Sequence, residues 1–140
     1  MRSIDQVALL FARLLLAALY LPDSVQKLTH FAAASAVLAK AGLPAPDLFA
    51  TLAIFCEIAG PLALIVGFMP RATALLMIAF TIAATLVAHR FWEAPSDQAS
   101  AQAANFLKNT AIIGGFLLYF VHGPGRFAWV GYKTSVKKRR

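Results

Sequence analysis

Four apolar stretches constrain the fold of this chain more than any other feature. They cover residues 4–21, 48–68, 72–89 and 106–121. A membrane-spanning helix needs about 20 apolar residues at a rise of about 1.5 Å per residue. The three shorter stretches reach this length with an extra turn, or with polar ends that extend to the interface. The sequence therefore predicts an all-α, integral membrane four-helix bundle, in which residues 1–140 form a single transmembrane domain.

Two charged residues of opposite sign lie deep within these stretches. Glu57 is in the middle of the second stretch, and Arg13 is in the middle of the first. An ionised side chain at the bilayer centre costs about 2.5–3.5 kcal/mol on the insertion scale. Counted from the ends of antiparallel helices, both residues reach about the same depth. We therefore predict a buried Arg13–Glu57 ion pair, which either contributes candidate catalytic groups or fixes helix register.

The segment between the first two stretches has the pattern of a short helix. In residues 28–41, Thr29 is a possible N-cap, Phe31 and Leu38 are apolar, and Gly42 is a stop signal. A helix of this length does not cross a bilayer. We expect it to lie at the membrane interface.

The basic residues are distributed unevenly between the two ends of the predicted bundle. The end that holds both termini carries Arg2, Arg71, Arg126, Lys133, Lys137, Lys138, Arg139 and Arg140, and the other end carries Lys27, Lys40, Arg90 and Lys108. By the positive-inside rule, this eight-to-four bias predicts that both termini are cytoplasmic. The basic tail, residues 126–140, contains Phe127, Trp129 and Tyr132, and we expect it to bind anionic lipid headgroups rather than nucleic acid.

Several polar side chains share one depth in the outer half of the predicted bundle. The candidate substrate-binding residues are Lys27, Glu57, His89, Trp92, Asn105, Lys108 and Asn109. Hydrogen-bond donors at the mouth of an apolar cavity suit a small aromatic or quinone-like ligand. An interfacial belt of aromatic and basic residues is the alternative, and it is our interpretation for Tyr20.

The composition limits the redox and metal chemistry that the chain can perform alone. Cys56 is the single cysteine, so there is neither an intramolecular disulfide nor a CxxC pair. His30 and His89 belong to one predicted end and His122 to the other, so we expect no metal site. We also expect no covalently bound cofactor; in any redox chemistry the electrons would be carried by a cofactor or a substrate, such as a quinone.

A series of short motifs spans almost the whole chain. They are Arg13 in a leucine-rich helix, Ser24-Val25-Gln26-Lys27, Gly42-Leu43-Pro44, Glu57-x-x-Gly60, Gly67-x-x-x-Arg71, Phe91-Trp92, Asn105-Phe106-Leu107-Lys108-Asn109 and Gly123-Pro124-Gly125-Arg126. In this order the chain resembles the DoxX-like family of small four-helix bacterial membrane proteins. Ser24 stands where the family usually has glycine. The resemblance implies the bacterial inner membrane and a subunit linked to oxidoreductases, in some members acting on thiosulfate and quinone.

Three hypotheses of function remain open from the sequence. The first is a membrane component of an oxidoreductase that interacts with a quinone or quinoid compound, with a redox enzyme as partner. The second is a proton-coupled small-molecule transporter that uses Glu57, since membrane-embedded carboxylates also occur in such proteins. The third is a structural assembly subunit of a membrane redox complex, in which the buried charges only set packing.

Overall fold

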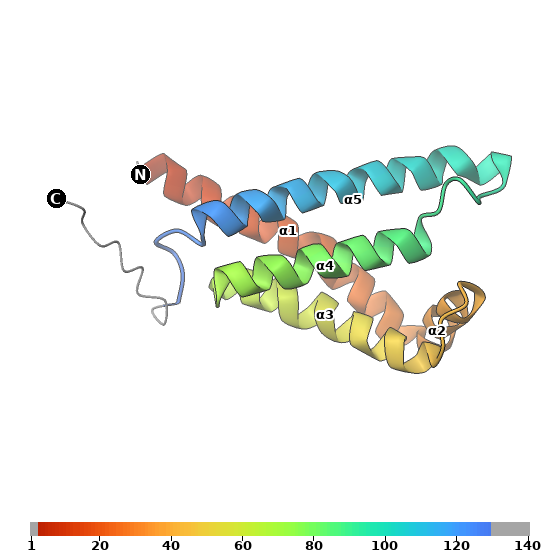
Figure 1. Ribbon diagram of the computed structural model, residues 1–140. Helices are drawn as coiled ribbons and strands as arrows, with labels where there is room; N and C mark the ends of the chain where they lie inside the picture. The colour runs from red at the N-terminus through yellow and green to blue at the C-terminus, as the bar shows by residue number, and fades with distance from the viewer. Residues whose placement is uncertain (1–2, 130–140) are drawn as a thin grey trace.

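The computed structural model describes residues 3–129, which form five helices and no strand (Figure 1). The helices are α1 (Ser3–Thr29), α2 (Phe31–Lys40), α3 (Pro46–Val66), α4 (Pro70–Ala88) and α5 (Ser96–His122). By length and composition, α1, α3, α4 and α5 can each cross a membrane. The predicted all-α bundle is therefore confirmed, and so is the short helix between the first two spans.

Different elements of the chain lie at the two ends of the bundle. The α3–α4 turn, the start of α1 and the end of α5 lie at one end, which we call the terminal end (Figure 1). Helix α2 and the α4–α5 connection lie at the other, which we call the α2 end. Helices α1 and α5 extend beyond the predicted apolar stretches, to Thr29 and back to Ser96. Hydropathy marks only the part of a helix that lipid covers, and polar turns can continue the same helix into the interface.

The core lies where α3 and α4 meet α1 and α5. Helix α1 packs along α3, and α4 packs along α5, with α3 and α4 in contact between them. Leu64, Met77 and Phe116 are fully buried at this centre. A Cβ added at Gly60 would lie 2.1 Å from the sulfur of Met77. The glycine therefore allows the close approach of α3 and α4.

Arg13 fastens three parts of the chain together at the terminal end. Its side chain is fully buried. Nε donates to the carbonyl of Leu64 at 2.8 Å, and Nη2 donates to that of Ile65. Nη1 donates to the carbonyls of Pro124 and Phe127 at 2.7 and 3.0 Å. Leu64 and Ile65 belong to the last turn of α3, where carbonyls lack helical partners and a positive charge is favourable. Arg13 thus links α1, the end of α3 and the segment after α5.

The segment after α5 lies directly against the end of α3. The backbone N–H of Trp129 donates to the carbonyl of Val66 at 2.8 Å. Gly67 ends α3 with φ +73°, and a Cβ there would lie 2.6 Å from that of Ala128. The remainder of the predicted basic tail, including Tyr132, Lys133 and residues 137–140, lies outside the described residues, as does Arg2. Headgroup binding by the tail stays a prediction.

We expect Arg13→Met to destabilise the fold strongly. Methionine fills similar space but removes the guanidinium donors from four backbone carbonyls, of which those of Leu64 and Pro124 accept buried hydrogen bonds. Hydrogen bonds to charged groups contribute about 1.5–3 kcal/mol each. A total loss of about 3 kcal/mol or more is expected in unfolding experiments in detergent. Arg71→Met is the control, because the exposed Arg71 only covers the ring of Phe120. Equal losses in both variants would contradict this role of Arg13.

Candidate functional site

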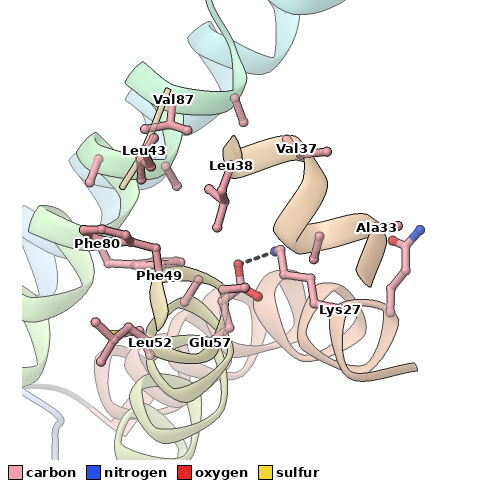
Figure 2. Close-up of a pocket in the computed structure, with 18 of the residues that line it drawn as sticks. Lys27, Ala33, Val37, Leu38, Leu43, Phe49, Leu52, Glu57, Phe80 and Val87 are labelled. Carbon is pink, nitrogen blue, oxygen red and sulfur yellow. Dashed lines mark hydrogen bonds and ion pairs between the residues drawn. The ribbon is translucent and has the colours of Figure 1, made fainter. Parts of the chain in front are cut away.

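An apolar cavity of about 490 Å³ lies at the α2 end of the bundle, between α1, α2, α3 and α4 (Figure 2). Small side chains leave this space open, among them Ala34, Ala53 and Ala84. Larger apolar groups from three helices complete the walls: Leu38 of α2, Phe49 and Leu52 of α3, and Phe80 and Val87 of α4. Pockets of roughly 300–1,000 Å³ with mostly apolar walls typically bind small molecules.

An ion pair forms the polar part of this cavity. Nζ of Lys27 lies 2.6 Å from Oε1 of Glu57, and both residues line the cavity (Figure 2). Glu57 is only 4% exposed. The side chain of Lys27 is 31% exposed and also lies 3.9 Å from Asp23. Glu57 is therefore the buried member of the pair, and Lys27 is the member that reaches the edge of the bundle.

The buried faces of α1 and α3 bring this pair together. Arg13, Ala17, Tyr20 and Ser24 form one buried stripe on α1, and Lys27 continues it by three residues. Side chains on a helix lean toward its N-terminus, so the long side chain of Lys27 reaches back into the bundle. Because α1 and α3 are antiparallel, that direction leads toward the middle of α3, where Glu57 lies.

The predicted Arg13–Glu57 pair is wrong. Arg13 bonds to carbonyls at the end of α3, and Glu57 bonds to Lys27 instead. The prediction aligned the two helices by their apolar stretches, but α1 begins beyond the end of α3 (Figure 1). Arg13 is therefore level with Leu64, which lies seven residues from Glu57, or about 10 Å along the helix axis.

The other predicted site residues lie outside the cavity. None of His89, Trp92, Asn105, Lys108 and Asn109 lines it. The cavity is bounded by α1 to α4, whereas these residues belong to the connection after α4 and to α5. The expected single cluster is therefore divided into two groups. Ligand binding by this second group stays a prediction.

Most residues of this second group form hydrogen bonds with other side chains. Nδ2 of Asn109 donates to Oγ1 of Thr85 at 2.9 Å, and Nδ1 of His89 lies 2.9 Å from Oε1 of Gln102. The exposed Lys108 donates to Asn105 within the same helix at 3.1 Å.

The remaining residue of this group, Trp92, packs against other aromatic side chains. The ring of Trp92 packs edge-on against Phe91 and Phe106. Trp92 is nevertheless 54% exposed. These contacts fasten the α4–α5 loop to the start of the last span.

Two features near the cavity were not predicted from the sequence. Tyr20 is not part of an interfacial belt: it is 8% exposed, and its hydroxyl lies 2.6 Å from Oγ1 of Thr81 in the core. Ser35 of α2 donates a hydrogen bond to the carboxylate of Asp47 at the start of α3, which holds α2 over the cavity. The regular spacing of small residues in these helices was the available signal for the cavity, but spacing does not reveal which faces are opposed.

Comparison with known proteins identifies relatives of this chain. The DoxX family model matches residues 8–90, which include both Lys27 and Glu57. The inner membrane protein YphA of Escherichia coli is 31% identical over 119 residues, which cover 85% of each chain. The inner membrane protein YqjF of the same organism is 32% identical over 129 residues, 91% of this chain and 93% of its own. No solved structure matches the chain significantly.

We expect a double-mutant cycle to separate the two charged groups. Lys27→Met and Glu57→Gln should couple by about 0.5–3 kcal/mol, because each single change removes the contact between the two side chains and Lys27→Met leaves the buried carboxylate without its cation. Arg13→Met and Glu57→Gln should be additive within about 0.5 kcal/mol, since these residues do not share a contact. Unfolding free energies in detergent provide the measurement, and the reverse pattern would restore the Arg13–Glu57 pairing.

Proposed function

The chain belongs to the DoxX family, and from this premise and the geometry of the cavity we propose that it is a membrane-embedded oxidoreductase component that binds a quinone or related quinoid compound. The cavity beneath α2 is the binding site. A separate redox enzyme exchanges electrons with the bound ring. This chain binds the ring and supplies the proton-bearing groups beside it.

The Lys27–Glu57 ion pair within an apolar cavity carries the proposal. A quinoid ligand has a flat apolar ring with oxygen atoms at its edge, so it needs apolar walls and a few polar partners. The walls come from alanine, leucine and phenylalanine side chains, and the polar partners are Lys27 and Glu57. An ammonium group donates hydrogen bonds and an ionised carboxylate accepts them. The pair can therefore contact either oxidation state of such a ring.

The position of the pair also suits proton exchange. Reduction of a quinone takes up protons as well as electrons, and these protons must reach a buried ring. Glu57 is buried in the cavity, whereas Lys27 is partly exposed and contacts the exposed Asp23. A chain of ionisable groups thus extends from the cavity to the edge of the bundle, as is common where protons move within membrane proteins.

The geometry favours ligand binding over the two alternative functions. In a proton-coupled transporter the carboxylate would be available to exchange its ion, but Lys27 already occupies one oxygen of Glu57. In an assembly subunit the pair would only fix packing, but the hydrogen bonds of Arg13 already fasten α1 to α3. A transporter would also need a cavity for its substrate, but in an assembly subunit the apolar cavity beside the pair has no role.

The relatives are inner membrane proteins, and this chain has four helices able to span a membrane. We further propose that both termini are cytoplasmic, on the basis of the eight-to-four basic bias. Reporter fusions after Arg140 and within residues 96–104 should report opposite sides of the membrane, with the C-terminal fusion inside. The same side for both fusions would exclude this topology.

We expect Ala53→Phe to weaken binding of tetramethyl-p-benzoquinone about tenfold or more, because the added ring fills the space that the ligand needs. Ala111→Phe is the matched control, since Ala111 is exposed on α5 and does not line the cavity. Calorimetric titration of purified protein in detergent measures the affinity, and a thermal melt confirms folding. Equal affinities in the two variants would place the ligand elsewhere. The proposed function would be refuted if the parent protein bound neither this quinone nor its reduced form, tetramethylhydroquinone.

A further inference from the structure

The two carboxylate oxygens of Glu57 have different surroundings. Oε1 accepts the hydrogen bond from Lys27 at 2.6 Å. Oε2 is buried and has no hydrogen-bond partner among the described residues. An ionised carboxylate oxygen can only accept hydrogen bonds. Glu57, which lines the cavity, therefore carries one buried acceptor that lacks a donor among the described residues.

The other polar side chains of the cavity do not fill this role. Gln26, Lys27, His30 and Cys56 line the cavity and carry donor groups. None of them donates to Oε2, and the only donor on Glu57 is Lys27, through the other oxygen. Buried polar groups in folded proteins nearly always have a partner, so an orphaned one in a binding cavity points to a group that arrives with the ligand.

The oxidation state of a quinoid ring decides whether it can be that partner. The carbonyl oxygens of a quinone are acceptors only, like Oε2 itself, so they would repel Oε2 and leave it without a donor. The hydroxyl groups of a hydroquinone are donors. A water molecule that satisfies Oε2 in the free protein must also donate to it, and a ligand that displaces such a water binds well only if it reproduces that bond.

We propose that the cavity selects the reduced, hydroxyl-bearing form of its ligand, a hydroquinone, through a hydrogen bond from a ring hydroxyl to Oε2 of Glu57. This inference rests on the proposed function and adds to it the redox state of the bound ring. Sites built to hydrogen-bond a ligand hydroxyl reject analogues that lack it more strongly than apolar pockets reject a change in size. Selectivity therefore depends on Glu57, whereas the apolar walls serve both forms.

A series of three ligands tests the inference on the unaltered protein. Tetramethylhydroquinone has two hydroxyl donors, tetramethyl-p-benzoquinone has none, and the dimethyl ether of the hydroquinone keeps the reduced ring but has no donor. We expect the hydroquinone to bind about tenfold tighter or more than either of the others, in calorimetric titrations without oxygen. Equal or tighter binding of the quinone would overturn the inference and leave the proposed function intact. Failure of all three ligands to bind would overturn both.

Two variants locate the origin of the preference. Glu57→Gln keeps the shape of the side chain but adds a donor, so the preference for the hydroquinone should fall to about threefold or less. Glu93→Gln is the matched control: it makes the same change at an exposed carboxylate that pairs with Arg90 and does not line the cavity, and the preference should persist. A preference that persists in Glu57→Gln, or that disappears in Glu93→Gln alone, would overturn the assignment to Oε2.

Discussion

The arrangement of this bundle depends on how one buried cation is satisfied. Arg13 lies where no water can solvate it, and in such surroundings every unsatisfied polar group costs free energy. Its donors bond to carbonyls of α3 and of the segment after α5. Because the guanidinium group is planar and holds several donors in fixed directions, these bonds fix α1, α3 and the following segment relative to one another. These bonds therefore set the position of α1 along the axis of α3.

The position of α1 along the axis of α3 determines which residue of α1 contacts the buried carboxylate of Glu57. With Arg13 at the end of α3, the middle of α3 lies beside the second half of α1, and Lys27 is the cation within reach of Glu57. The buried charges of the bundle thus have different roles. Among the described residues, the hydrogen bonds of Arg13 go to backbone carbonyls and hold the fold, although Arg13 also borders a second cavity, between α1 and α5. Lys27 and Glu57 instead pair with each other in the cavity beneath α2.

Two of the remaining polar contacts join α5 to α4 and to His89, which follows α4. Hydrogen bonds between membrane helices contribute modestly, typically about 0.6 kcal/mol and up to about 2. The contact between Asn109 and Thr85 and that between His89 and Gln102 are of this kind. They stabilise the packing of the last span, while a neighbouring face of α4, which holds Phe80, Ala84 and Val87, lines the cavity. The same helix therefore contributes to both core and site through different faces.

The sequence by itself determined the fold class, the four spans, the short helix after the first span, and the importance of Arg13, Lys27 and Glu57. Hydropathy and buried charge are properties of single segments, so they can be read along the chain. Only the tertiary structure decided that Lys27 is the partner of Glu57, that Arg13 bonds to carbonyls, and that residues of four helices enclose a cavity. These features depend on the relative level and rotation of helices, and a shift of two turns exchanges one ion-pair partner for another without altering the hydropathy of either segment.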